Sequence, residues 1–270
     1  DGIAAAGGSA VGQVADVTDM EQMRAAATLA VERFGAIDVI VNNAGVMPLA
    51  FFADHERAWE KWHKAIDIHI KGVVNGISAV YDQMIAQGRG QVVNIASIYG
   101  NGGFEGGSGG VYSATKAAVT MLSDSLRIEA KGKIKVTTVK PTGVAGTNLA
   151  SWIVNDRAIR GIVGQRVSSY KEHITQMLQG ELPPELTDAD SIKYWLITPE
   201  DLAEAVVHVI DQPWGHQPVR RDRPREWRGL PVLTSIRGTS RIEISDDDAR
   251  RGTCGGIRRR GRSSSHVRAG

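Results

Sequence analysis

The chain has 270 residues, enough for one α/β domain with a complete core, and its hydrophobic content of 42% is ordinary for a soluble protein. No run reaches the roughly 18 consecutive apolar residues of a membrane helix, the start lacks the basic region of a signal peptide, and the single cysteine excludes an intramolecular disulfide, so we expect a reducing, cytoplasmic setting. The net charge of +2 hides an uneven division, because residues 1–216 carry −6 and residues 217–270 carry +8.

The first predicted elements are a strand at Val11–Ala15 and a helix that begins after Asp19. Asp19 is a favourable helix N-cap, and Gly35 is a typical stop after Phe34. The glycine-containing stretch Gly7–Gly12 follows no predicted strand and opens no helix. We therefore interpret it as a linker and not as a phosphate-binding loop.

The next predicted elements are a strand at Ile37–Val41 and a long helix at Glu56–Met84. Apolar residues recur at helical spacing throughout the second segment, which predicts a face that packs on a core. Trp59 and Trp62 belong to this apolar stripe, and we expect both to be core residues and not cofactor contacts.

A second strand–helix pair follows, with the strand at Gln91–Ala96 and the helix within residues 108–131. The connection at 100–110 is rich in glycine, and we expect it to form a mobile lip over a binding site. A third apolar run at Ile134–Val139 predicts another strand.

Residues 142–198 form a long excursion from the expected sheet, with a helical stretch near Val167–Leu178. Connections this long are usually functional, so we consider this excursion a substrate-loop region. A proline and acidic residues after Thr198 predict the start of a helix that ends near Asp211. Side chains that either wall a substrate pocket or pack within this excursion are Trp152, Ile153, Tyr170, Met177 and Trp195.

The composition changes after Gly215, where lysine disappears and arginine becomes frequent. Residues 217–270 contain 14 Arg and 6 acidic residues, and the only apolar run is Leu230–Ile236. Such a segment buries too little apolar surface to offset the entropy lost on ordering. We expect residues 216–270 to be a disordered or frameshifted tail. A nucleic-acid-binding arm through Arg258–Arg262 is the functional alternative, although no aromatic residues accompany it.

The residues that follow three of the apolar runs predict a site. Asn43, Ser97 and Pro141 each come after a predicted strand, and alternating strands and helices are typical of a parallel sheet whose site lies at the carboxyl ends of its strands. Tyr112 and Lys116 are four residues apart, so a helix places them on one face. A lysine ammonium within about 4–6 Å lowers a tyrosine pKa, which predicts a proton-transfer pair.

In the order and spacing of these motifs the chain resembles the short-chain dehydrogenase/reductase family. The resemblance extends from Val11 to Gln212 and implies a Rossmann-like, doubly wound parallel sheet with helices on both faces. In the family, a first β-α-β unit with a glycine-rich turn precedes the strand expected here at Val11–Ala15, and we expect this unit to be lacking. The matching motifs are Asp16-Val17, Asn42-Asn43-Ala44-Gly45, Ser97, Tyr112 with Lys116, and Pro141-Thr142-Gly143-Val144.

The resemblance implies hydride transfer between NAD or NADP and an alcohol or carbonyl carbon. Tyr112 is then the acid/base, Lys116 lowers the pKa of Tyr112 and holds the cofactor ribose, and Ser97 holds the substrate oxygen. His69 stands where the family usually has an asparagine that supports a proton path, so it joins the catalytic candidates. No metal is expected. The implied cofactor-binding residues are Asp16, Val17, Asn43, Ala44, Gly45, Tyr112, Lys116, Pro141, Val144 and Thr147.

Two interpretations of the whole chain stay open. One is an active oxidoreductase on residues 1–215 that assembles as a homodimer or homotetramer and acts on a small alcohol or carbonyl compound. The other is an inactive remnant or interaction module with the same fold, because the segment that cradles the cofactor's pyrophosphate is expected to be missing and binding is then weak. The substrate and the choice between NAD and NADP cannot be read from these residues.

Overall fold

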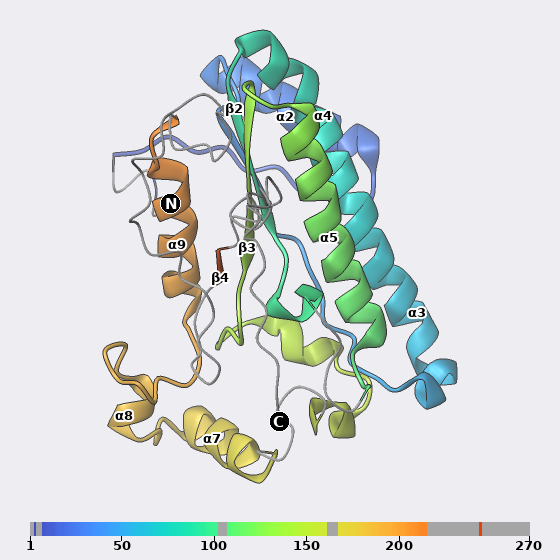
Figure 1. Cartoon of the computed structure of the whole chain (residues 1–270), viewed down its shortest axis with the longest axis vertical. Helices are drawn as coiled ribbons and strands as arrows, with labels where there is room; N and C mark the ends of the chain where they lie inside the picture. Colours follow the sequence, from blue (N-terminus) through green and yellow to red (C-terminus); the bar gives the residue numbers. More distant parts are fainter. Residues whose placement is uncertain (1–2, 4–6, 102–106, 161–166, 215–242, 245–270) are drawn as a thin grey trace, which may run out of the picture.

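A four-stranded sheet in the order β1-β2-β3-β4 forms the centre of the computed structural model (Figure 1). β1 (Val39–Asn42), β2 (Gly90–Ile95) and β3 (Ile134–Lys140) are parallel, which confirms the expected parallel sheet. β4 (Glu243–Ile244) pairs with β3 in the antiparallel sense. The structure describes residues 3, 7–101, 107–160, 167–214 and 243–244.

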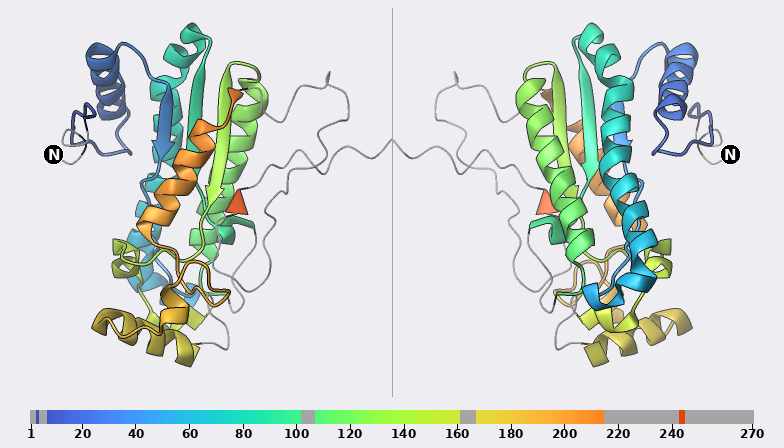
Figure 2. Two further views of the ribbon diagram at one scale, coloured as in Figure 1. Left: turned by 90° about the vertical axis from the view of Figure 1, so that its left-hand side faces the viewer. Right: turned by 90° about the vertical axis from the view of Figure 1, so that its right-hand side faces the viewer.

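Helices cover both faces of this sheet, as the resemblance implies (Figure 2). α4 (Gly72–Gln87) and α5 (Gly110–Glu129) lie on one face, and α9 (Pro199–Asp211) lies on the other. All six residues of β2 are buried because the strand is paired on both edges and covered on both sides. The largest core cluster lies on the α4–α5 side and consists of Ile37, Val80, Met84, Val92, Leu126, Ala130, Ile134 and Val136.

Two helices begin and end where their capping residues predict. α2 (Met20–Phe34) starts after Asp19, whose carboxylate accepts hydrogen bonds from two backbone N–H groups of the first turn. The helix ends at Gly35, whose φ of 82° is in the left-handed region that suits glycine. α9 begins with a reciprocal capping box between Thr198 and Asp201, so both expected starts are confirmed.

The expected strand at Val11–Ala15 is wrong. These residues pair with no strand in the part of the chain that the structure describes, and the Val14 side chain is 98% exposed. An apolar alternation becomes a strand only where a partner supplies hydrogen bonds and a face to pack on. Trp59 is a second error, because it is 49% exposed and contacts His63, whereas Trp62 is buried in the core as expected.

The long helix predicted at Glu56–Met84 is interrupted. α3 (His55–Ile66) continues into a π-helical turn, η2 (Asp67–Lys71), and only then into α4. A π turn adds a residue to the helical repeat and rotates the helix beyond it, and such turns occur frequently at functional sites. Apolar periodicity does not reveal the interruption, because the pattern resumes in α4.

The long excursion contains short helices below the sheet (Figure 1). They are η4 (Asn148–Trp152), η5 (Asp156–Ile159), α7 (Val167–Gln179) and α8 (Pro184–Thr187). α7 lies within one residue of the predicted helix at each end. Short 3-10 turns at Phe52–Asp54 (η1) and Ile98–Asn101 (η3) flank the edge where the parallel strands end.

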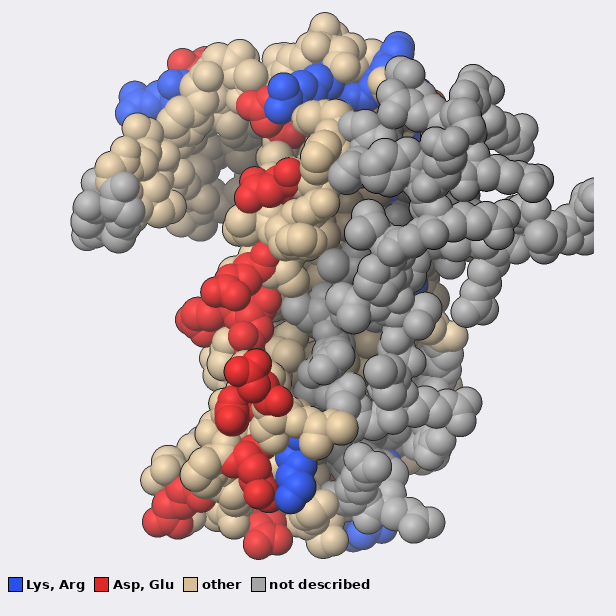
Figure 3. Space-filling view, turned by 60° about the vertical axis from the view of Figure 1, so that its left-hand side comes forward, with Lys and Arg blue, Asp and Glu red and all other residues tan. Residues whose placement is uncertain are grey.

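Acidic side chains gather in a stripe on the face that carries α8 and α9 (Figure 3). The exposed acidic residues of these two helices include Glu185, Glu200, Glu204 and Asp211. The acidic body expected from composition is therefore visible as a surface feature. No helix among the described residues is long and apolar enough to cross a membrane.

Two expectations fall partly or largely outside the described residues. The proposed mobile lip at 100–110 has residues 102–106 outside them. The basic tail, 216–270, is described only at Glu243–Ile244, so neither its expected disorder nor the nucleic-acid alternative is tested.

Candidate active site

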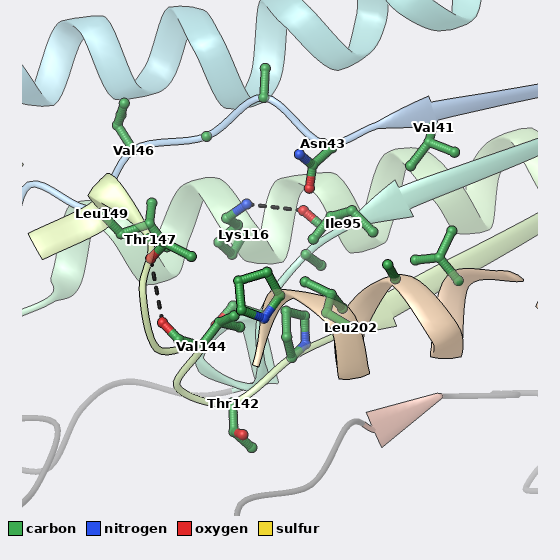
Figure 4. A pocket seen from close by; sticks show the side chains of 18 of the residues that line it. Val41, Asn43, Val46, Ile95, Lys116, Thr142, Val144, Thr147, Leu149 and Leu202 are labelled. Atoms are coloured by element: carbon green, nitrogen blue, oxygen red, sulfur yellow. Dashed lines mark hydrogen bonds between the residues drawn. The ribbon is translucent and has the colours of Figure 1, made fainter. Parts of the chain in front are cut away.

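The residues at the ends of three strands meet at one cavity, as predicted. Asn43 follows β1, Ser97 follows β2 and Pro141 follows β3, and all three line a cavity of about 680 Å³ (Figure 4). Parallel strands all end at the same sheet edge, which is why residues separated by nearly a hundred positions come together there.

The cavity draws its walls from five parts of the chain: the loop after β1, the end of β2, helix α5, the segment after β3, and helix α9. Asn43 comes from the loop after β1 and Lys116 from α5, and the two lie near each other beside Ile95, while the segment that carries Val144 and Thr147 lies at another side (Figure 4). The lining residues are Val41, Asn43, Ala44, Gly45, Val46, Ile95, Ala96, Ser97, Tyr112, Lys116, Pro141, Thr142, Val144, Thr147, Asn148, Leu149, Trp152, Pro199, Leu202, Ala203, Val206 and Val207.

Tyr112 lies in the first turn of α5 and is only 6% exposed. Burial raises the pKa of its phenol, and a hydrogen bond with Ser97 lowers that pKa in part. The contact between Tyr112 and Ser97 is the one that the predicted proton-transfer site needs. At neutral pH the buried tyrosine therefore keeps its proton.

The expectation that Lys116 lowers the pKa of Tyr112 is wrong for this arrangement. The Lys116 ammonium lies 6.0 Å from the centre of the Tyr112 ring and donates a 2.9 Å hydrogen bond to the carbonyl of Ile95 (Figure 4). Burial lowers the pKa of Lys116 itself to about 8, because a charged amine loses its hydration there. Lys116 is thus a buried cation that stays mostly protonated at neutral pH and faces the cavity.

His69 does not line the cavity. It lies in the π turn η2, is 1% exposed, and uses both ring nitrogens. Its Nε2 accepts a 3.0 Å hydrogen bond from the backbone N–H of Val46, and its Nδ1 lies 2.8 Å from the hydroxyl of Thr115. The ring therefore stands behind the loop that follows β1.

Asp16 and Val17 lie away from the cavity. The Asp16 carboxylate accepts hydrogen bonds from the backbone N–H and hydroxyl of Thr18, which hold its pKa below the usual value. The carbonyl of Val17 accepts a hydrogen bond from the Asn75 amide. The fold places these residues next to α4, and their expected contact with adenine stays a prediction.

The structure adds functional candidates that the sequence patterns did not single out. Thr115 lies next to Lys116 and touches His69, but nothing in its sequence context distinguishes it from other helical threonines. Leu202 and Val206 bring α9 to the cavity wall. Their spacing of four residues marks one apolar face, although it does not say what that face meets. Of the five possible pocket side chains in the excursion, Trp152 lines this cavity.

Comparisons with known proteins give one family. Residues 1–158 match the family described as short chain dehydrogenase. An uncharacterized oxidoreductase of Listeria innocua is 34% identical over 217 residues, which cover 78% of this chain and 81% of that protein. A 3-alpha-(or 20-beta)-hydroxysteroid dehydrogenase of Mycobacterium tuberculosis is 38% identical over 142 residues, 52% of this chain and 53% of that protein. A solved short-chain dehydrogenase from Streptomyces avermitilis superposes with a TM-score of 0.57 at 29% identity, covering 78% of this chain and 70% of that one.

Proposed function

The chain belongs to the short-chain dehydrogenase family and is an oxidoreductase, and from that premise we propose that it moves hydride between NAD or NADP and an alcohol or carbonyl carbon at Ser97, Tyr112 and Lys116. The observation that carries this proposal is the convergence of these three side chains on one cavity at the carboxyl ends of the strands. Hydride chemistry needs a proton donor, a donor to the substrate oxygen and a nearby cation, and the three residues supply one each.

The residues around the cavity suit the nicotinamide end of a dinucleotide. Asn43 and Thr147 offer polar groups, Lys116 offers a cation, and the loop backbone at Ala44 and Gly45 is open to the cavity. Pro141 and Val144 complete this side of the cavity. When bound, the nicotinamide gives or accepts the hydride, and the protein supplies position and electrostatics.

Because Tyr112 keeps its proton at neutral pH, it can donate that proton to a substrate, which favours the direction of carbonyl reduction. In that direction its phenolic proton goes to the substrate oxygen while the carbonyl carbon gains the hydride. The hydroxyl of Ser97 donates a hydrogen bond to the same oxygen as negative charge develops there. Lys116, whose ammonium lies 6.0 Å from the centre of the Tyr112 ring, is in this proposal the cation that holds the cofactor ribose.

Turnover of a carbonyl panel tests this assignment directly. We expect the chain to oxidise NADH or NADPH in the presence of small ketones and aldehydes, measured as loss of the reduced nicotinamide absorbance. Ser97→Ala should lower kcat by roughly 10²–10³-fold. Ser113→Ala is the matched control, because the buried Ser113 hydroxyl has no hydrogen-bond partner among the described residues. Equal rates for wild type and Ser97→Ala would refute the proposed role.

A homo-oligomer accompanies the proposal. Two exposed apolar side chains support it: Met121 is 66% exposed on α5 and Val74 is 41% exposed on α4, and the two helices lie side by side (Figure 2). We expect light scattering to give at least a dimer mass, and Met121→Lys to lower it. A monomer mass for the wild type at micromolar concentration would contradict this. The expected cytoplasmic location stays a prediction.

A further inference from the structure

The hydrogen bonds around His69 assign the position of its proton. Nε2 accepts from the N–H of Val46, so that nitrogen carries no proton. The Thr115 hydroxyl donates its own proton to the carbonyl of Tyr112 at 2.7 Å, so its oxygen must act as acceptor toward the ring. His69 is therefore the neutral tautomer with hydrogen on Nδ1, and a directed chain runs from His69 through Thr115 to the backbone of Tyr112.

This chain of hydrogen bonds joins two of the segments that line the cavity. Val46 ends the loop that begins at Asn43, and both line the cavity. Thr115 lies on α5 between Tyr112 and Lys116, the two residues of this helix that line the cavity. The ring thus connects the loop to the helix with one hydrogen bond at each nitrogen.

The spacing across this connection is tight. A Cβ atom added at Gly45 would lie 3.3 Å from Nε2 of His69 and 3.6 Å from Nζ of Lys116. The loop therefore passes close to both side chains, and the imidazole sets how near the loop comes to the lysine. A shift of the ring would move the loop backbone relative to the ammonium group.

The same geometry argues against proton transfer through His69. A second proton would place an N–H on Nε2 directly opposite the N–H of Val46, and both are donors. The groups that face the ring are the edge-on Tyr112 ring at 5.8 Å between centroids and the ammonium of Lys116, and neither favours a positive imidazole. Burial and Lys116 hold the pKa of His69 down to about 3, so the ring stays neutral at working pH.

We propose that His69 and Thr115 are positioning residues, a His69–Thr115 clamp that fixes the loop 43–46 at a set distance from Tyr112 and Lys116. The π turn η2 contributes by directing His69 inward from the helix that carries it. The clamp rests on the proposed function only in the assumption that dinucleotide binds between this loop and α5; its hydrogen bonds can be tested without any ligand.

The experiment uses the full chain and the variant Thr115→Val, which keeps the shape of the side chain but removes its hydrogen bonds. Thr120→Val is the matched control, because Thr120 makes the same kind of bond to the backbone of Lys116 on the same helix. Three quantities are measured: the His69 tautomer by nitrogen NMR from acidic to basic pH, hydrogen exchange at the Val46 amide, and binding of NADH and NADPH.

In the wild type and in Thr120→Val we expect a ring protonated only on Nδ1 that does not titrate, and a protected Val46 amide. Thr115→Val should lose the fixed tautomer, raise Val46 exchange by at least about tenfold and weaken dinucleotide binding by about tenfold. Thr115→Ser should rescue all three, since it restores the hydroxyl. If Thr115→Val does not fold, His69→Leu is measured instead, and it should raise Val46 exchange and weaken dinucleotide binding to the same extent.

A folded Thr115→Val with unchanged tautomer, Val46 exchange and binding would overturn the clamp. Weakened binding with unchanged Val46 exchange would also overturn it, because the loop would then not be held by Thr115. If even the wild type binds neither dinucleotide, the proposed function fails, while the tautomer and the exchange rate still decide whether the clamp exists.

Discussion

The wall of the cavity and the excursion that borders it are built in opposite ways. The wall is formed by β2, β3 and one face of α5. Its strands are almost entirely buried: β2 has no exposed residue and β3 has one that is partly exposed. The excursion, residues 142–198, has no buried residue in α8 or η4 and leaves Ile192 81% exposed. A single backbone bridge, between Val144 and Ile197, ties its two ends together.

The difference shows where geometry has to be fixed. Most buried polar groups in the wall are satisfied: Asn94 bonds to Asn42 and Ser123, and Gln91 bonds to the carbonyl of Val209. The hydroxyls of Ser113 and Thr138 are exceptions, with no hydrogen-bond partner among the described residues. A satisfied buried network permits one arrangement and so holds catalytic groups still. In the excursion, Asn155 is hydrogen-bonded to Asp54 and to the backbone of Leu49. Trp195 makes ring contacts with Tyr170 and His173, and such contacts tolerate change. We therefore expect the wall to determine rate and the excursion to determine which substrate enters.

The largest effect is expected for Tyr112→Phe, which tests whether the wall determines the rate. Removing the phenolic hydroxyl deletes the proposed proton donor without changing the buried ring, so kcat should fall by roughly 10²–10⁴-fold with little loss of stability. Steady-state rates and thermal unfolding measure both quantities.

Tyr99→Phe is the matched control for Tyr112→Phe. Tyr99 packs in the same apolar cluster, and it does not line the cavity in the described structure. Its variant should keep kcat within about threefold, because no group at the reacting atoms changes. A large loss in Tyr99→Phe together with an active Tyr112→Phe would reverse the assignment of the two tyrosines.

Lys116→Met tests how a buried charge in the wall affects the free energy of unfolding. Burial lowers the pKa of Lys116 from 10.5 to about 8, so the folded state holds a charge at neutral pH at a cost of roughly 3 kcal/mol. Between those two pKa values Lys116 is protonated in the unfolded chain and neutral in the folded chain, so folding releases a proton. The wild-type free energy of unfolding should therefore rise as the pH rises from about 8 to 10.5. The variant should be more stable by about 1–2 kcal/mol at pH 7, after loss of the hydrogen bond to Ile95, and should lack this rise.

Denaturant unfolding at neutral and basic pH measures this difference. Lys133→Met at an exposed position is the control and should change the free energy of unfolding by less than about 0.5 kcal/mol. A less stable Lys116→Met would mean that the fold needs the ammonium group. Lys116 would then stabilise the wall instead of destabilising it.

The sequence predicts features that depend on local residues far better than features that depend on contacts between distant segments. Asp19 and Gly35 determine the ends of α2 through local hydrogen bonds and a local φ angle, so no tertiary knowledge is needed. The meeting of Asn43, Ser97 and Pro141 follows from parallel strands alone. Two other features depend on contacts between distant segments, which no periodicity in the sequence records. They are the π turn at His69 and the hydrogen bond of Lys116 to the carbonyl of Ile95.

The mildest test concerns the excursion, through Trp152→Ala. Trp152 lines the cavity from η4, and Lys61 lies 5.9 Å from the centre of its ring. Removing an apolar wall costs about 1–3 kcal/mol of substrate discrimination, so KM for a bulky carbonyl substrate should rise about tenfold while kcat changes little. Initial rates over a series of substrates of increasing size measure this split.

Trp59→Ala is the control for Trp152→Ala, because Trp59 is half exposed on α3 and does not line the cavity in the described structure. It should leave both KM and kcat nearly unchanged. The contrast matters most if Trp152→Ala lowers kcat by as much as Tyr112→Phe does. The excursion would then be holding the reacting atoms in place, because a change confined to binding leaves kcat alone. In that case the buried wall, however well its hydrogen bonds are satisfied, would not by itself fix the catalytic geometry.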